Sequence, residues 1–164
     1  MMHRAQTIEE KAVLAAYIAS KIGTTPQALI GSMPFEVASI TRKGRPMGAV
    51  LYTNYRKHSV EMTVAGEPGW ISRGSIQAAF HFPFCQLGVW TVLAMVNRNN
   101  AASRELTRRI GFAELCVIET GGTRGEDLIL YALTRDKCLW INDEAPIQAG
   151  PVVYASGHGA AMVN

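Results

Sequence analysis

Three consecutive residues, Arg73, Gly74 and Ser75, have the chemistry to hold an anion. They begin a segment whose composition predicts a helix from about residue 73 to residue 87. The first amides of a helix have no intrahelical acceptor, and the helix dipole favours negative charge beside them. An arginine, a flexible glycine amide and a hydroxyl would strengthen such a site. The structural alternative is that Ser72 caps the helix, while the arginine is solvated and the glycine has no special role.

A second group of polar side chains lies in NNAASRELTRRIGF (99–112). Asn100 can cap a helix from about 101 to 110, because its side chain can accept a hydrogen bond from a first-turn amide. Gly111 supplies the left-handed residue that ends such a helix. The apolar stripe of this helix and the basic residues beside it are Ala102, Leu106 and Ile110, and Arg104, Arg108 and Arg109. The segment is predicted to connect two strands, and its residues alone indicate no reaction.

The bulk composition excludes several classes of protein. The 164 residues carry a net charge of +3, which permits an anionic ligand or a nucleic acid without indicating either. Cys85, Cys116 and Cys138 are far apart and form no CxxC or Cys/His cluster, so no metal site is expected. The odd cysteine count, with no signal-peptide core, favours reduced thiols and a cytoplasmic protein. No apolar run approaches the ~18 residues of a membrane span.

The elements that must position these groups alternate between helical and strand periods. Thr7 and Glu10 have the spacing of a capping box at the start of the first helix. The predicted helices are 7–23, 24–33, 73–87 and 101–110; the predicted strands are a hairpin within 35–55 that turns at KGRP (43–46), then 58–67, 89–96, 114–121 and 128–135. The element order is therefore α-α-β-β-β-α-β-α-β-β, which places the chain in the α+β or α/β class.

Three further expectations concern local structure. The run 89–96 is continuously apolar, which is typical of a strand buried on both faces. Pro83 should kink its helix near Ala79–His81, because proline lacks the amide donor and clashes with the carbonyl four residues earlier. The composition changes past Trp140 to small residues without a period. We therefore expect one domain over residues 1–141 and a loosely structured tail over 142–164.

At this point the sequence resembles a known family. The pattern V-x-x-x-N-x-x-S-x-x-L-x-x-x-x-G-F is similar to a segment of the GNAT superfamily, the acyl-CoA-dependent N-acetyltransferases. It is formed by Val96, Asn100, Ser103, Leu106, Gly111 and Phe112. With FHFPFCQLG and GEDLILYALTRDKCLW, the chain more narrowly resembles a phage- and prophage-associated branch of GNAT-like proteins. The last block contributes Asp127, Ile129, Tyr131, Arg135, Cys138 and Trp140. The resemblance covers about residues 8 to 141.

The resemblance implies a fold and a cofactor. The fold would have a mixed, mostly antiparallel central sheet with one splayed pair of strands. Acetyl-CoA would be the acyl donor, with its pantetheine in the splay and its pyrophosphate at the start of the helix after the third strand. The cofactor-binding residues implied are Arg73, Gly74, Ser75, Asn100 and Ser103. One departure is Ile76, which stands where the pattern has its first glycine and is expected to obstruct the phosphate.

The catalytic residues implied are less complete. Thr107 stands where many GNAT enzymes have a tyrosine that protonates the leaving thiolate, and a threonine hydroxyl is a poor acid. Either Tyr131 substitutes for it or the thiolate leaves unassisted, because a thiol pKa is only about 8.5. Glu61 and Glu67 are the candidates for the base, since GNAT enzymes often place one on or after the third strand. The alternative is that Glu61, Glu67 and Tyr131 have no catalytic role and are ordinary surface or core residues.

Three functions remain open from the sequence. The first is an acetyl-CoA-dependent N-acetyltransferase acting on an unknown primary amine. The second is a non-catalytic binding module on the same fold, which the Ile76 and Thr107 departures favour. The third is a phage-type nucleic-acid-modifying enzyme, for which Arg104, Arg108 and Arg109 would be the cationic face. A homodimer is also expected to be possible, because exposed sheet edges invite pairing.

Overall fold

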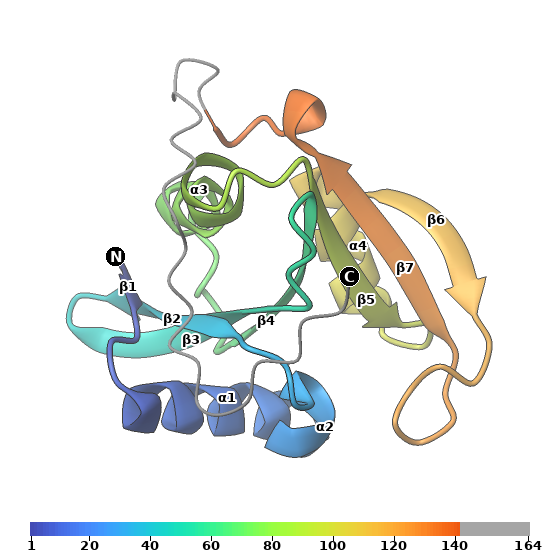
Figure 1. Ribbon diagram of the computed structural model, residues 1–164, viewed down its shortest axis with the longest axis horizontal. Helices are drawn as coiled ribbons and strands as arrows, with labels where there is room; N and C mark the ends of the chain where they lie inside the picture. Colours follow the sequence, from blue (N-terminus) through green and yellow to red (C-terminus); the bar gives the residue numbers. More distant parts are fainter. Residues whose placement is uncertain (142–164) are drawn as a thin grey trace, which may run out of the picture.

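The computed structural model describes residues 1–141, so the predicted tail lies outside the described residues (Figure 1). The elements confirm the predicted order and add a short strand at the start of the chain. In chain order they are β1 (Met2–Arg4), α1 (Ile8–Ile22), α2 (Pro26–Ile30), β2 (Glu36–Arg42), β3 (Arg45–Thr53), β4 (Ser59–Gly66), α3 (Arg73–His81), the π-helical turn η1 (Phe82–Gln86), β5 (Thr91–Asn97), α4 (Ala101–Ile110), β6 (Ala113–Ile118), β7 (Leu128–Thr134) and the 3-10 turn η2 (Arg135–Lys137).

One open sheet of seven strands, in the order β1-β2-β3-β4-β5-β7-β6, organises the described part of the chain. Every neighbouring pair is antiparallel except β4 and β5. That parallel pair is short, since only Ser59–Glu61 of β4 pairs with Thr91–Leu93 of β5. Beyond those residues the two strands separate (Figure 1). The expected mixed, mostly antiparallel sheet with a splayed strand pair is therefore confirmed.

Helices cover the sheet from both sides, and strand alternation divides the core between them. On β3, Leu51 and Ala49 pack with Ile18 of α1, whereas Val50 and Tyr52 pack in the larger cluster with Phe80 of α3. In Figure 1, α1 and α2 lie below the sheet and α3 lies above it. No helix within residues 1–141 has both the length and the apolar character that crossing a membrane requires.

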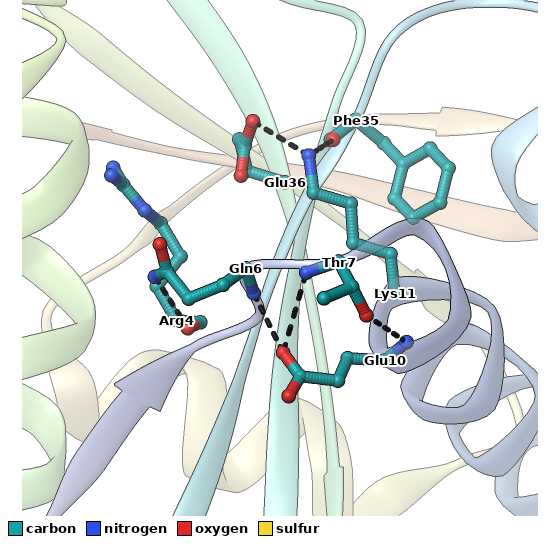
Figure 2. A network of polar contacts seen from close by, with 7 residues as sticks. All are labelled: Arg4, Gln6, Thr7, Glu10, Lys11, Phe35 and Glu36. Carbon is teal, nitrogen blue, oxygen red and sulfur yellow. Dashed lines mark hydrogen bonds and ion pairs between the residues drawn. The ribbon is translucent and has the colours of Figure 1, made fainter.

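The predicted capping box at the start of α1 is confirmed (Figure 2). The Glu10 amide donates to the Thr7 hydroxyl at 3.1 Å, and the Glu10 carboxylate accepts from the amides of Gln6 and Thr7. One turn later, Lys11 Nζ lies 2.9 Å from a carboxylate oxygen of Glu36 at the start of β2. These contacts fix the first helix against the hairpin that follows it.

Pro83 acts differently from the simple kink that the sequence predicts. The α-helical pattern ends at His81 and continues as η1, where the Leu87 amide donates to the Phe82 carbonyl five residues earlier. The carbonyl of Ala79 would pair with the amide of residue 83, which proline lacks. The buried hydroxyl of Tyr52 donates to that carbonyl at 2.7 Å instead. The helix therefore widens into a π turn, and a tyrosine from β3 satisfies the orphaned oxygen.

The structure differs from the sequence-based expectations at two strands. The sequence did not indicate β1, which is three residues long and pairs with β2. The prediction that 89–96 is a strand buried on both faces is wrong. The strand begins at Thr91, only Val92 within it is fully buried, and Met95 is 45% exposed. The physical reason is the splay, because β5 has no neighbour on its β4 side after Leu93 and its side chains there line an open cleft.

Candidate functional site

The splay between β4 and β5 opens into a cleft of about 1060 Å³. Its walls come from segments far apart in the sequence. They are the end of α1 with α2, residues 61–66 of β4, residues 94–97 of β5, the face of α4, and the connection between β6 and β7 at 121–126.

Backbone groups of β4 face this cleft without a strand partner. The Glu67 amide donates to the Met47 carbonyl of the β3 side, which fixes the phase of the antiparallel ladder. Since hydrogen-bonded residues alternate along such a ladder, Thr63 and Ala65 bond towards β3. Val64 and Gly66 therefore turn their N–H and C=O groups towards the gap that β5 has left. An extended ligand with amide groups could pair with them as an additional strand would.

The face of α4 forms the opposite wall. The Asn100 side chain accepts from the Ser103 amide at 3.0 Å, so the predicted cap is confirmed, and both residues also line the cleft. Leu106 and Ile110 supply apolar wall further along the helix. Thr107 lines the cleft as well, and its hydroxyl donates to the Ser103 carbonyl at 2.7 Å. The wall is thus polar at the start of α4 and apolar towards its end.

Trp70 closes the cleft near the start of α3. Its indole packs directly over Gly66, where an added Cβ would come within 2.5 Å of a ring carbon and 2.8 Å of the Met47 carbonyl. Only glycine fits this contact, because no side-chain atom can be accommodated between the strand and the ring. Sequence reasoning missed Trp70, although a glycine at a strand end followed closely by an aromatic residue is a signal of close approach.

The three residues proposed to hold an anion lie at the start of α3 but form none of the cleft wall. Arg73 is exposed, and an added Cβ on Gly74 would meet nothing within 4 Å. Ser75 is buried, and its hydroxyl accepts from the Ser72 amide at 2.8 Å and contacts the Ser72 carbonyl at 2.9 Å. The hydroxyl of Ser75 therefore serves the helix cap, while Arg73 and Gly74 leave the first turn open to solvent.

Ile76, which was expected to obstruct a phosphate, turns its side chain into the core. Its side chain is 7% exposed and packs in the larger core cluster, so it points away from the helix start. Its amide donates to the Ser72 carbonyl at 3.0 Å, so this amide belongs to the helix. An anion at the start of α3 would consequently meet the amides of Arg73 and Gly74 and not the isoleucine side chain, because the Ser75 amide is bonded to the Ser72 hydroxyl.

The structure separates the three catalytic candidates. Glu61 lines the cleft at the last paired residue of β4, where the splay begins. Glu67 forms no part of the cleft wall, and its carboxylate lies 2.5 Å from Nζ of Lys21, whose own pKa is raised by this contact. Tyr131 is fully buried outside the cleft wall, and its hydroxyl donates to Glu114 at 3.2 Å. Of the three, only Glu61 is positioned at the cleft.

One further carboxylate in the cleft wall, Glu126, was missed by sequence reasoning. It packs so closely over Gly122 that an added Cβ there would lie 2.2 Å from its carboxyl carbon, and it accepts from the Arg124 amide at 2.9 Å. Arg124 in turn donates to the Gly23 carbonyl at the end of α1, at 2.7 Å. The turn signal GGTRGED was visible in the sequence, but its approach to α1 was not.

No group of three or more histidine, cysteine, aspartate or glutamate side chains within residues 1–141 is arranged to hold a metal ion. Cys85 and Cys138 are buried, and burial is the main cause that raises the pKa of the Cys138 thiol. The polar groups that line the described cleft are the carboxylates of Glu61 and Glu126, the ammonium of Lys21, side-chain amides and hydroxyls, and backbone groups.

Neither a protein-family model nor a curated protein matches the sequence. Solved structures do match. A variant of spermidine N-acetyltransferase SpeG from Vibrio cholerae aligns with a TM-score of 0.65 and 13% identity, over 87% of this chain and 98% of that chain. The chain has the GNAT fold. The N-acetyltransferase PseH from Campylobacter jejuni, in complex with acetyl coenzyme A, aligns with a TM-score of 0.53 and 15% identity, over 67% and 74% of the two chains.

A protein from Desulfovibrio desulfuricans assigned to the GNAT family aligns with a TM-score of 0.59 and 18% identity, over 82% of this chain and 99% of that chain. A further solved structure, described as a probable acetyltransferase, is covered by this chain over 65% of its own length. At these identities the similarity describes the fold. The function has to be argued from the GNAT-fold cleft of this chain and its own residues.

Proposed function

We propose that the protein is an N-acetyltransferase that transfers the acetyl group of acetyl-CoA to a primary amine. The observation that carries this proposal is the cleft between β4 and β5, with the N–H and C=O groups of Val64 and Gly66 facing it. The pantetheine arm of coenzyme A contains two amides on an extended chain, which suit an open strand edge. A structural neighbour, PseH, is in complex with acetyl coenzyme A.

The residues of this chain fit the rest of the cofactor. The amides of Arg73 and Gly74 and the exposed Arg73 side chain are suited to its pyrophosphate, because the helix dipole and unpaired amides favour an anion, whereas the Ser75 amide is bonded to the Ser72 hydroxyl. Asn100 and Ser103 would face it from α4, and Leu106 would contact its apolar part. Bound in this way, acetyl-CoA would supply an activated thioester. The protein would hold the amine beside it and exclude water.

Glu61 is the residue proposed to accept the proton of the amine. An amine must lose its proton before it attacks a carbonyl carbon, and Glu61 is the charged side chain closest in sequence to the point where β4 and β5 separate. Glu126 adds a second carboxylate to the wall, and Lys21, which also lines it, is paired with Glu67, so the described wall favours a cationic acceptor. Glu67 is less suitable because Lys21 already pairs with it.

The departing thiolate would leave without a proton from a tyrosine. The Thr107 hydroxyl is bonded to the Ser103 carbonyl, and Tyr131 is buried against Glu114. A thiol with a pKa near 8.5 is an adequate leaving group at neutral pH. This arrangement also supports the second candidate, a GNAT-fold module that binds acyl-CoA without transferring the acetyl group.

The experiment that tests cofactor binding is a calorimetric and thermal titration with acetyl-CoA. Ala102 lines the cleft on an exposed face of α4, so Ala102→Trp should fill the cleft and weaken binding at least tenfold. Glu105→Trp places the same side chain on the same helix outside the cleft wall and should bind as the unchanged protein does. Equal affinities for the two variants, or no binding by the unchanged protein, would overturn the cleft as a cofactor site.

The role of Glu61 is tested separately from binding. Glu61→Gln should retain acetyl-CoA affinity and lose about 10²- to 10⁴-fold in acetyl transfer to a panel of primary amines, as expected for a general base. Glu67→Gln is the matched control and should keep most of the activity. Binding of acetyl-CoA without transfer to any amine would favour the non-catalytic module. The resemblance to phage-associated proteins stays a prediction.

A homodimer also remains a proposal, and β6 is the edge on which it would form. Among the described residues this strand is paired only on its β7 side, and Leu115 and Val117 are 57% and 40% exposed. Exposed apolar edge strands without proline or lysine invite pairing with another strand. Light scattering on the unchanged protein and on Val117→Lys tests this, because a lysine on the edge should convert a β6-paired dimer to a monomer.

A further inference from the structure

The ends of three strands bring together a basic surface around one exposed tryptophan. We call it the Trp90 surface, and it consists of Arg56–His58, Trp90 and Arg135–Leu139. The Trp90 amide donates to the His58 carbonyl at 2.9 Å, and the Arg135 amide donates to the Trp90 carbonyl at 2.9 Å. These backbone bonds place the start of β4, the start of β5 and the end of β7 side by side, near the top of Figure 1.

Trp90 is the most exposed of the three tryptophans. It is 65% exposed, whereas the other two tryptophans, Trp70 and Trp140, are partly buried against the core. Leu139, in the same surface, is 88% exposed. An indole that contributes little to the core contributes little to folding, so its exposed ring is available for a partner.

Charge decides which partner chemistry suits this ring. The surface holds four cationic side chains, Arg56, Lys57, Arg135 and Lys137, against one carboxylate, Asp136. Its net charge of +3 equals that of the whole chain, so the rest of the protein is balanced. The Arg135 guanidinium donates to the Phe84 carbonyl of η1, while its backbone amide bonds to the Trp90 carbonyl.

The basic face expected on α4 has less uncompensated positive charge than the Trp90 surface. Arg108 lies 3.6 Å from Glu105 and 4.0 Å from Glu114, and Arg104 donates to the Arg98 carbonyl at 3.1 Å. Carboxylates thus offset part of that charge, and no tryptophan lies on α4. The basic region with an exposed aromatic ring is the Trp90 surface, at the opposite end of β4 and β5 from the cleft.

We propose that the Trp90 surface binds single-stranded nucleic acid, with a base stacked on Trp90 and the flanking phosphates held by Arg56, Lys57 and Lys137. An exposed aromatic ring beside several cations is the combination that such strands use, because every base has a face that stacks and every linkage carries a negative charge. Bases in a duplex are already stacked on each other, so a duplex can use only the charges. The proposal does not depend on acetyl transfer.

The test is fluorescence anisotropy with a fluorescein-labelled oligo(dT) of about 20 nucleotides, over a series of salt concentrations. Affinity should fall steeply as salt rises, as counterion release requires. Trp90→Ala should weaken binding about tenfold or more at every salt concentration, which is the usual effect of losing one stacking ring. Trp90→Phe should restore most of the affinity, because a phenyl ring also stacks.

Arg109→Ala is the matched control. Arg109 is exposed on α4, so this substitution removes one positive charge at a position outside the Trp90 surface. It should change affinity far less than Trp90→Ala or Lys57→Ala. Equal effects of all three variants would indicate attraction by net charge alone and would overturn the site. So would tighter binding of a duplex of equal length, or no binding at low salt.

A last outcome would identify a protein partner instead. Light scattering without nucleic acid compares the molar mass of the Trp90→Ala variant with that of the unchanged protein. If the variant has the lower mass, the ring lies between two copies of the chain, and the proposal is wrong. Calorimetry with acetyl-CoA on Trp90→Ala separates this test from the proposed function. The variant should bind acetyl-CoA normally, because Trp90 forms none of the cleft wall.

Discussion

At the scale of single residues, the contact between Tyr52 and Ala79 shows how one side chain supplies a hydrogen-bond donor that another residue lacks. Pro83 removes the amide that would pair with the Ala79 carbonyl, and that carbonyl lies inside the larger core. An unpaired buried carbonyl is costly, and Tyr52 supplies the donor at 2.7 Å. Burial raises the pKa of Tyr52 far above its ordinary value, so the phenol remains protonated and continues to donate.

Tyr52→Phe should therefore lower the free energy of unfolding by about 1–3 kcal/mol, the usual cost of an unsatisfied buried acceptor. Chemical denaturation would measure it. The same substitution at Tyr17, which is only partly buried, should cost far less. In a Pro83→Ala background the amide of residue 83 becomes available to Ala79, so Tyr52→Phe should then cost less. An equal cost in both backgrounds would show that the hydroxyl does not replace the missing amide.

At the scale of elements, much of the fold could be predicted because its signals are local. Thr7 and Glu10 form the expected capping box, and Asn100 and Gly111 bound α4 as expected. The hairpin turn lies at Lys43 and Gly44, both with positive φ, inside the predicted KGRP turn. Each of these features depends on side chains within a few residues of the backbone that they satisfy.

The features that the sequence did not predict depend on distant partners. Met2–Arg4 is a strand only because β2 lies beside it, and β5 opens to solvent only because β4 leaves it after three pairs. The candidate site divides in the same way. Glu61 and Asn100 could be proposed from position along the chain, whereas Glu126 and Trp70 reach the cleft through loops whose course the sequence does not reveal.

The connection between β6 and β7 depends on Asp127. Its carboxylate accepts from the Thr120 amide at 3.1 Å and from Arg98 at 3.1 Å, which ties this loop to the turn between β5 and α4. The Thr120 amide, followed by Arg98, holds the pKa of Asp127 below its ordinary value. A lowered folded-state pKa means that this contribution is present above the unfolded pKa of about 3.9 and is lost as the pH falls through the folded pKa.

Asp127→Asn should therefore lower the melting temperature at pH 7, and this difference should shrink as the pH falls through the folded pKa of Asp127, where the natural carboxyl also loses its charge. Thermal unfolding followed by circular dichroism between pH 2 and 7 measures this difference. Glu119→Gln removes a carboxylate of the same connection and should leave the melting temperature unchanged. A difference between Asp127→Asn and the natural protein that is constant with pH would mean that the ionised carboxylate is not the stabilising group.

At the scale of the whole molecule, the strand pairing between the two halves of the described sheet consists of three residue pairs of β4 and β5, and the larger core cluster also spans both halves. Strands β1 to β4 carry α1 and α2 on one side of this junction, and β5 to β7 carry α4 on the other. A ligand in the cleft contacts both halves, so its binding energy adds to their association. At one hundred times its dissociation constant, such a ligand stabilises the folded state by about 2.7 kcal/mol.

Amide hydrogen exchange can detect where that stabilisation arises. If acetyl-CoA pairs with the open edge of β4, its addition should slow exchange most at the amides of Val64 and Gly66. The amides of Thr63 and Ala65 already bond towards β3 and should change less, so the protection should alternate along the strand. Exchange followed residue by residue by NMR would show this pattern. Uniform protection of residues 62–66, or protection confined to α4, would mean that the cofactor does not pair with β4 in this way.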